Sequence, residues 1–442
     1  MFILGNGTLV TRNDQNSVIA NGAVVVEGKF IKDVGETQAM RAKYPDAEFK
    51  DARGGLIMPG FINTHMHYYS TFARGMNAKS KPASTFGQIL TGTWWKMDKL
   101  LTLEGTYYSA LMPMIEMLRQ GVTSAIDHHA SPYAVRGSLF EIYKASKVAG
   151  IRSNLCYEIS DRDGEKIAQD GLDETAEFIK FASEQNDDMI KALIGFHASM
   201  TISDGTLDRA LALADATQTG FHVHCAEGIE DVVDCVAKYD MRVIERWHKR
   251  GVLSPRSIAV HCVNLKEWEI DLLADSGVAV VTNPESNMNN AVGSTPALEM
   301  MRKGVLLGLG TDAYTTDMME SLKVAGILMR HNHRDPSVGW AEAPKMLFEN
   351  NKKIINRFLR DKTGELTAGY LADIIVCDYT APTPVNSETI NGHVLFGLAG
   401  RNVDTTIING VVRYENHALV DIDYAEVAAK SQEEAQKLWN RL

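Results

Sequence analysis

Eight short apolar runs, each typical of a β-strand, alternate with amphipathic stretches of helical period through the middle of this 442-residue chain. The runs fall near residues 57–65, 122–128, 152–158, 190–197, 220–225, 257–262, 277–282 and 304–311. Between the first two, LEGTYYSALMPMIEMLRQG places Tyr108, Leu111, Ile115 and Leu118 on one helical face. Eight strands alternating with helices over roughly 250 residues predict an α/β fold, the (β/α)8 or TIM barrel. A doubly wound open sheet is the alternative.

Both ends of the chain predict a second, smaller domain. Residues 1–56 alternate β-like runs such as FILGNGTLV with turn signals, and the barrel pattern then covers residues 57–367. A β-like pattern returns over 368–442, with a hairpin turn expected at Asn409-Gly410 and a polar amphipathic helix at the end. We therefore expect one small β-sandwich domain assembled from both termini.

Composition narrows the class of protein. A net charge of −11 argues against a non-specific nucleic-acid binder, which needs a basic face. The five cysteines are odd in number and form no CxxC motif, so a reducing compartment is expected. The N-terminal sequence lacks the pattern of a signal peptide, and no run approaches the ~18 apolar residues of a membrane helix. These features favour a cytoplasmic enzyme with a small-molecule substrate and no membrane partner; a homo-oligomer is left open.

Residues with metal-binding and proton-transfer chemistry stand at the C-terminal ends of four predicted strands, where barrel enzymes place their active sites. They are His65 and His67 in PGFINTHMH, His224 and Glu227 in GFHVHCAE, His261 in SIAVHC and Asp312 in GLGTDA. Residues at positions i and i+2 of a strand share one face, so the first two imidazoles can reach one ion. We chose His224 over His222 as a ligand because it lies nearer the strand end.

Three imidazoles and one carboxylate suit a metal ion that activates water, with a water completing the coordination. Binuclear barrel hydrolases commonly use a carboxylated lysine at the mouth of strand four, but here that mouth carries His197 and the nearest lysine, Lys191, begins the strand. We therefore expect one divalent ion, most simply Zn²⁺, with Fe²⁺ and Mn²⁺ as alternatives. Glu227 is expected to transfer protons, and His261 and Asp312 to orient the water and stabilise developing charge.

Other polar and aromatic residues near the strand ends are candidate substrate contacts. His129 ends strand two, Glu158 ends strand three, and Arg74 follows the strand of the first two histidines. Trp95 lies in the long loop after strand one, where an indole can stack on a planar ring. Core packing or a solvated surface position is the alternative for each.

The motifs PGFINTHMH, HxxE at 224–227, VHC around His261, NPESNMNNAVG and GTDA resemble the amidohydrolase superfamily, in order and spacing. The similarity covers essentially the whole chain and is to the mononuclear aminohydrolase branch, which includes guanine deaminase, adenosylhomocysteine deaminase and the triazine hydrolases. TSAIDHHASP and CDYTAPTP are similar to a group in that branch whose own substrate is unassigned.

This resemblance implies that His65, His67, His224 and Asp312 bind the metal and that Glu227 and His261 are catalytic. It also implies that His197 and the segment 282–290, including Asn287, line the substrate pocket. One departure affects the substrate side. Related deaminases often carry an Ala-Pro-His or Ala-Pro-Tyr turn after strand four, whereas this chain has His197-Ala198-Ser199-Met200.

These observations predict a metal-dependent aminohydrolase that removes an amino group from an N-heterocycle, such as a purine, pterin or triazine, and releases ammonia. A chlorohydrolase or a cyclic-amide hydrolase using the same metal site is the alternative reading. A metal-binding protein without catalytic activity is a third.

Overall fold

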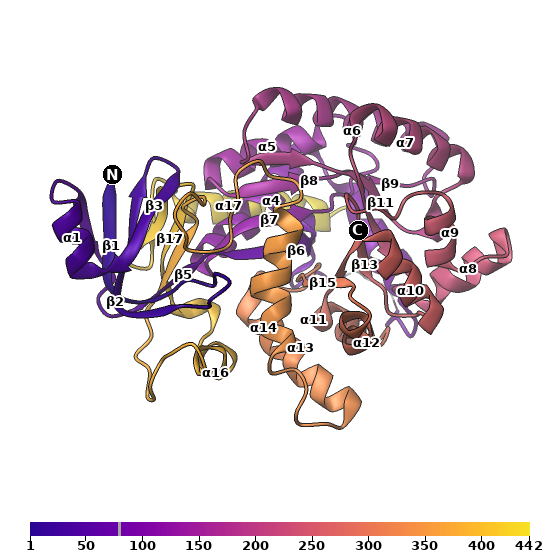
Figure 1. Cartoon of the computed structure of the whole chain (residues 1–442). Coiled ribbons are helices and arrows are strands. Elements are labelled where there is room, and N and C mark those ends of the chain that lie inside the picture. Colours follow the sequence, from indigo (N-terminus) through magenta and orange to yellow (C-terminus); the bar gives the residue numbers. More distant parts are fainter. Residues whose placement is uncertain (78–80) are drawn as a thin grey trace.

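The computed structural model, which describes residues 1–77 and 81–442, confirms a parallel (β/α)8 barrel with a smaller domain beside it (Figure 1). Two parallel ladders, β10-β8-β7-β6 and β15-β14-β13-β12-β11-β9, make up the barrel. The third barrel strand is split into β8 and β9, and the fourth into β10 and β11, where the two ladders meet. The wall closes between the last strand and the first, because His65 O accepts hydrogen bonds from Thr311 N (3.0 Å) and Asp312 N (3.1 Å). The barrel strands are β6 (Phe61–Met66), β7 (Val122–Asp127), β8 (Arg152–Leu155), β9 (Glu158–Ile159), β10 (Ile190–Ala192), β11 (Ile194–Phe196), β12 (Phe221–Cys225), β13 (Ile258–His261), β14 (Ala279–Thr282) and β15 (Leu306–Leu309).

The apolar run at 57–65, predicted as one strand, is two strands in different sheets. β5 (Leu56–Pro59) pairs with the small domain, and β6 then begins the barrel at Phe61. The chain changes sheet at Gly60, where an added Cβ would lie 2.2 Å from Thr123 Cγ2. Periodicity could not separate the two strands, since all residues of both are buried.

Helices cover the outside of the barrel, and several begin and end with the expected caps. The Thr102 hydroxyl, for example, accepts from Gly105 N at 2.9 Å, and Gly150 ends its helix in a left-handed conformation. The helices are α4 (Leu103–Arg119), α5 (Ser138–Ala149), α6 (Glu165–Gln185), η4 (Ser199–Thr201), α7 (Asp204–Thr217), α8 (Ile229–Tyr239), α9 (Val243–Lys249), α10 (Glu267–Ser276), α11 (Pro284–Asn289), α12 (Ala297–Arg302), α13 (Met318–His333), α14 (Glu342–Pro344), η5 (Lys345–Asn350) and α15 (Asn351–Ile355).

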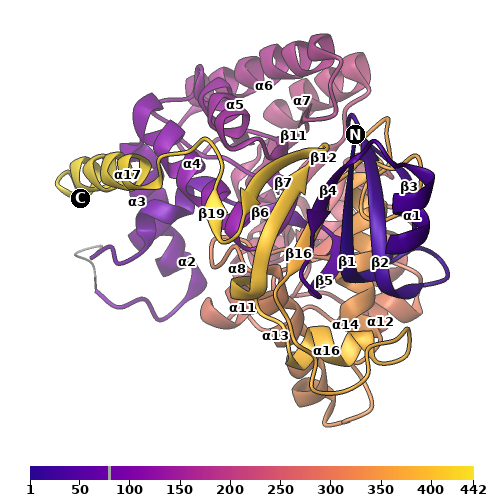
Figure 2. The same cartoon turned by 90° about the vertical axis from the view of Figure 1, so that its left-hand side faces the viewer.

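The small domain takes strands from both ends of the chain, which lie side by side in Figure 2. Hydrogen bonds join them into one nine-stranded sheet, in the order β19-β18-β17-β16-β5-β1-β2-β3 with β4 on β1. The predicted turn at Asn409-Gly410 joins β17 to β18, with φ angles of 54° and 76°. The elements of the small domain besides β5 are β1 (Phe2–Val10), β2 (Val18–Glu27), β3 (Phe30–Glu36), α1 (Thr37–Lys43), β4 (Glu48–Asp51), β16 (Ile374–Cys377), α16 (Ile390–Phe396), η6 (Gly400–Asn402), β17 (Val403–Ile408), β18 (Val411–Glu415) and β19 (Ala418–Leu419).

A buried ion pair ties the small domain to the barrel. Arg152 at the start of β8 and Asp373 just before β16 form a salt bridge, and each side chain is 1% exposed. The carboxylate also accepts from Thr363 Oγ1 at 2.6 Å and Asn409 N at 2.8 Å. Its acceptor positions are therefore well used, as a buried charge requires.

The C-terminal helix α17 (Tyr424–Trp439) packs on α4 and on the long loop after β6 (Figure 2). Trp439 Nε1 donates to Phe72 O at 2.8 Å, and Leu438 is buried with Tyr69 and Met97 of that loop. The loop contains η1 (Tyr68–Ala73), α2 (Phe86–Ile89), η2 (Leu90–Trp94), α3 (Trp95–Met97) and η3 (Asp98–Leu100). Over the described residues, no helix has the length and apolar character needed to cross a membrane.

Candidate active site

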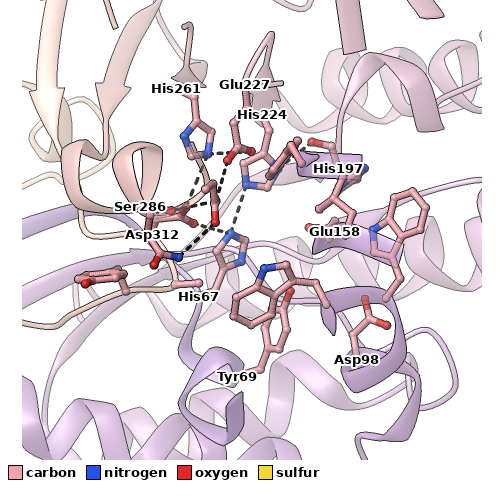
Figure 3. A pocket seen from close by; sticks show the side chains of 18 residues that line it. His67, Tyr69, Asp98, Glu158, His197, His224, Glu227, His261, Ser286 and Asp312 are labelled. Atoms are coloured by element: carbon pink, nitrogen blue, oxygen red, sulfur yellow. Dashed lines mark hydrogen bonds and ion pairs between the residues drawn. The ribbon is translucent and has the colours of Figure 1, made fainter. Parts of the chain in front are cut away.

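A cavity opens at the C-terminal ends of the barrel strands, and the predicted chemical residues gather around it (Figure 3). The loop after β6 forms one wall, and α11 with the residues after β15 forms another. The lining consists of His67, Tyr69, Phe86, Leu90, Trp94, Trp95, Asp98, Glu158, His197, His224, Glu227, His261, Ser286, Asn289, Asn290, Asp312, Ala313 and Tyr314.

The four predicted metal ligands converge at the floor of this cavity. His67 Nε2 lies 3.2 Å from His224 Nε2 and 3.1 Å from Asp312 Oδ1. His65 Nε2 lies 3.3 Å from the same carboxylate oxygen. All four residues are at most 7% exposed, and the three imidazoles have ligand atoms within 4.8 Å of one another. Figure 3 shows His67, His224 and Asp312 directed toward a common point.

Hydrogen bonds on the outer side of the histidines fix which nitrogen faces this point. His67 Nδ1 donates to His128 O at 2.5 Å, and His224 Nδ1 donates to His197 O at 2.7 Å. A neutral imidazole with Nδ1 protonated presents a lone pair at Nε2. The two Nε2 atoms therefore face each other at 3.2 Å with lone pairs that repel unless a positive charge lies between them. This donor set fits a divalent metal ion.

The electrostatics of the cluster also favour a positive charge. Burial lowers the pKa of His67, but the hydrogen bond and charge of Asp312 outweigh it and raise this pKa to about 9. Burial opposes ionisation of Asp312, yet His65 and His67 hold the pKa of Asp312 well below its usual range. The carboxylate is thus anionic, whereas burial lowers the pKa of His65 to about 3 and the pKa of His224 well below its usual range, so that both imidazoles are neutral. His67 is the imidazole of these three that binds a proton where a metal ion would lie.

Glu227 and His261 lie at the edge of the cluster that faces the cavity. Glu227 Oε2 is 3.4 Å from His261 Nε2, and Asn290 Nδ2 donates to Glu227 Oε1 at 3.2 Å. Burial, with the charge of Asp312, raises the pKa of Glu227 to about 7 against the opposing effect of His261. A carboxyl group with this pKa can both accept and return a proton near neutral pH.

The backbone is left-handed at His261, the last residue of β13, and at Asp312, three residues after β15, with φ of 68° and 56°. Such a conformation is uncommon for residues with a side chain and is concentrated at functional sites. Asp312 is then held by Ser286 of α11, whose hydroxyl donates to Asp312 Oδ2 at 2.5 Å.

The side of the cavity opposite Asp312 carries Glu158, His197 and Asp98 (Figure 3). Trp95 lies beside His197, with the two ring centroids 5.7 Å apart. Glu158 Oε2 lies 3.3 Å from His128 Nδ1. His197 Nδ1 contacts Thr201 Oγ1 at 2.9 Å, which leaves its Nε2 for a ligand.

Three of the predicted substrate contacts lie outside the cavity lining. His129 is buried beside it, with Nε2 2.9 Å from Ser131 Oγ. Asn287 lies behind His261, whose Nδ1 is 2.8 Å from Asn287 Oδ1. Arg74 is exposed and forms a two-pronged ion pair with Glu116, at 2.6 and 2.9 Å.

Ser286, Asn289 and Asn290 lie in the lining and belong to the segment 282–290 that the resemblance placed at the pocket. Asp98, Tyr69 and Tyr314 were not singled out from the sequence. Asp98 is 1% exposed and stands three residues after Trp95. Lys191, in contrast, pairs with Asp188 at 2.8 Å, at the beginning of its strand.

A parallel barrel with a buried His₃Asp cluster and an adjacent Glu–His pair defines a metal-dependent hydrolase site. Residues 56–413 match the model of the amidohydrolase family. The chain belongs to that family.

Three curated relatives match between 89% and 100% of the chain. A 5'-deoxyadenosine deaminase from Methanosarcina barkeri is 29% identical over 100% of this chain and 99% of its own. A second 5'-deoxyadenosine deaminase, from Methanothermobacter thermautotrophicus, is 32% identical over 89% of both. A 5-methylthioadenosine/S-adenosylhomocysteine deaminase from Syntrophomonas wolfei is 28% identical over 99% of each.

Solved structures share the fold. An adenosine deaminase from Xanthomonas campestris with bound zinc has a TM-score of 0.86 at 24% identity, covering 99% of this chain and 98% of the other. Atrazine chlorohydrolase from Arthrobacter aurescens complexed with zinc has a TM-score of 0.83 at 21% identity, covering 98% and 100%.

Proposed function

We propose that this protein is a metal-dependent aminohydrolase that replaces an amino group of an N-heterocycle with oxygen and releases ammonia. The position of Glu227 carries the proposal, because it stands between the His₃Asp cluster and the cavity, within 3.4 Å of His261. The deaminase names of the three curated relatives support the same reaction class.

The proposed ligands are His65, His67, His224 and Asp312, and the proposed metal is one zinc ion. A divalent ion at this cluster supplies Lewis-acid chemistry and lowers the pKa of water to about 7. Zinc is favoured because imidazole and carboxylate suit it and because two solved structures with the same fold contain bound zinc.

The protein's own groups supply the proton transfers. Glu227 Oε2 takes a proton from the attacking water and delivers it to the ring nitrogen beside the amino-bearing carbon. His261 Nε2, whose Nδ1–H is held by Asn287, accepts a hydrogen bond from the same water and orients it. Asp312 Oδ2 is kept in place by Ser286. The ring carbon gains an oxygen, the amino group takes up a proton, and ammonia leaves.

The test is Glu227→Gln. This substitution keeps the shape and the contact with Asn290 but removes the proton acceptor. Turnover should fall by about 10²–10⁴-fold, the usual contribution of a general acid–base group. Zinc content should remain near one per chain, since Glu227 is outside the proposed ligand set.

Ammonia and chloride release are measured together on a panel of amino-purines, amino-pteridines, amino-triazines and chloro-triazines. Glu177→Gln, an exposed substitution of the same type on α6, is the matched control. Near-normal turnover or loss of zinc in Glu227→Gln would refute the assigned role. Chloride without ammonia from the wild type would replace the proposed reaction by dehalogenation.

A further inference from the structure

The cavity has two chemically different sides. Glu227, His261 and Asp312 occupy the reacting side, and Glu158 and Asp98 lie on the other (Figure 3). The proposed reaction uses no group of the second side. Two carboxyl groups there, 5% and 1% exposed, need an explanation, because burial of an acidic group is costly without partners.

Glu158 is a carboxylate with unused hydrogen-bond acceptor positions. A carboxylate offers about four acceptor positions, and the contact with His128 Nδ1, at 3.3 Å, uses one of them. Burial opposes ionisation of Glu158, but the nearby His197, His128 and Arg162 outweigh it and hold its pKa well below the usual range. The residue lines the cavity, so a ligand there meets a hydrogen-bond acceptor with a full negative charge.

Asp98 adds a second acceptor to the same wall when it is ionised; burial raises its pKa to about 7 against the opposing charge of Arg162. Its Oδ2 pairs with Arg162, whose guanidinium lies 5.1 Å from the Trp95 ring centroid, while its Oδ1 is buried with no hydrogen-bond partner among the described residues. Trp95 Nε1, a donor, is likewise buried without a partner in that described part of the chain. Unsatisfied buried polar atoms that border a cavity indicate groups that a ligand completes.

We propose that Glu158 and Asp98 recognise ring N–H groups, so that the substrate is an amino-substituted heterocycle that also carries amide-type N–H, as guanine and pterin rings do. This inference rests on the proposed function and names the substrate class of that site. Trp95 Nε1 and His197 Nε2 would meet the acceptor atoms of the same ring.

The adenine ring of an adenosine derivative does not match this wall. With N9 bonded to ribose, the ring offers only acceptors at its nitrogens, and the donors of the base are those of the amino group. The ribose hydroxyls are donors too, but they lie beyond N9, whereas a Glu158 oxygen lies within 4.8 Å of a ligand atom of His67, close to the reacting side. That amino group has to face Glu227 to leave as ammonia. The ring nitrogens would then turn lone pairs toward Glu158, and buried carboxylates left unpaired reject such a ligand strongly. This chain is therefore expected to differ in substrate from relatives named for deoxyadenosine.

The experiment compares four compounds on the zinc-loaded full chain: guanine, pterin, 9-methyladenine and 5'-deoxyadenosine, the last two having no ring N–H. Ammonia release gives kcat/KM, and calorimetry gives the dissociation constants. Guanine or pterin should exceed both adenine compounds by about 100-fold or more in kcat/KM, in line with the loss expected when a charged hydrogen bond is left unmade. Equal or better use of 5'-deoxyadenosine would overturn the inference.

Glu158→Gln and Asp98→Asn examine the named side chains. Each substitution should reduce the ratio of kcat/KM for guanine or pterin to kcat/KM for the adenine compounds by about tenfold or more, with zinc content unchanged. Glu177→Gln should leave this ratio as it is. A uniform loss on all four rings would show a structural role instead. If a variant fails to fold or to bind zinc, the wild-type ranking decides.

The two proposals fail in different ways. If no ring yields ammonia, the proposed function is refuted, and the dissociation constants still test the recognition. Tighter binding of guanine and pterin than of the adenine compounds supports it, and equal or weaker binding refutes it.

Discussion

Ser286→Ala is the substitution that most directly tests how the fold holds its metal cluster. The Ser286 hydroxyl donates to Asp312 Oδ2 at 2.5 Å, while Asp312 Oδ1 faces His65 and His67 at 3.3 and 3.1 Å. One oxygen is thus anchored on α11 and the other is directed at the proposed metal. Both residues are at most 7% exposed, so water replaces the lost donor poorly.

A hydrogen bond to a charged group is worth about 1.5–3 kcal/mol. Loss of about 2 kcal/mol corresponds to a factor of about 30 in an equilibrium constant. Mutation of such outer partners of a metal ligand typically costs 10–100-fold in metal affinity, and the two estimates agree. We therefore expect Ser286→Ala to bind zinc about 30-fold more weakly, with Ser286→Thr close to the wild type if the larger side chain is accommodated.

Zinc affinity is measured by competition with a chromogenic chelator, and folding by urea unfolding of the metal-free chains. Ser294→Ala on the neighbouring segment, which removes a hydroxyl bonded to Asn332 rather than to the cluster, is the control. A change below about threefold in zinc affinity for Ser286→Ala, with the metal-free stability unaltered, would refute the anchoring role.

Three further outcomes follow from the buried charges. Burial raises the pKa of Glu285 from its ordinary 4.5 to about 7. The contribution of Glu285 to stability is therefore complete below pH 4.5 and is lost as the pH rises through 7. In urea unfolding, the free energy of unfolding of Glu285→Gln should exceed that of the wild type by about 2–3 kcal/mol at pH 8 and match it near pH 4.5. Arg152→Met strands the buried Asp373 and should cost about 3–5 kcal/mol of unfolding free energy, part of which Asp373→Leu restores in the double variant. Chelation should lower the melting temperature of the wild type reversibly, and a His67→Ala variant that shows the same zinc-dependent shift would contradict the proposed ligand set.

The barrel and the metal cluster could be predicted from the sequence for a topological reason. In a parallel barrel every strand delivers its C-terminal end to the same face, so side chains far apart in the sequence meet there whatever the helices between them do. His65, His224 and His261 are the last or next-to-last residues of β6, β12 and β13, and Asp312 lies three residues after the end of β15. Their convergence therefore follows from strand order alone.

No such rule determines where the side chains of the loops point. Arg74 was predicted to contact substrate from its place after β6; its guanidinium pairs with Glu116, and the residue lines a groove that shares His67 and Asp312 with the cavity. Asp98 was not singled out, although three short helical segments after residue 85 bring it into the wall. The direction of a loop side chain depends on packing between distant segments, here α17 on the first loop, which a local pattern does not record.

The structure was also needed to decide which of two neighbouring residues at the end of a strand faces the site. His128 and His129 point to opposite faces, and only the first lies among the ring contacts of the metal cluster. Asn287 was predicted to touch substrate but lies against His261, one step behind the cavity.

The four histidines of the site all use Nδ1 for a contact on the outer side of the cluster. The Nδ1 atoms of His67, His224 and His261 meet the oxygen atoms of His128, His197 and Asn287, respectively, and His65 Nδ1 meets His222 Nε2 at 2.9 Å. Each outer oxygen selects the tautomer with the proton on Nδ1, and so each Nε2 is left as a lone pair directed inward. An inward proton on any of them would compete with the metal or with the attacking water. At three of the four histidines the outer partner is thus a carbonyl or amide oxygen, which does not titrate. In the proposed reaction this leaves Glu227, whose pKa burial raises to about 7, as the group that moves the proton.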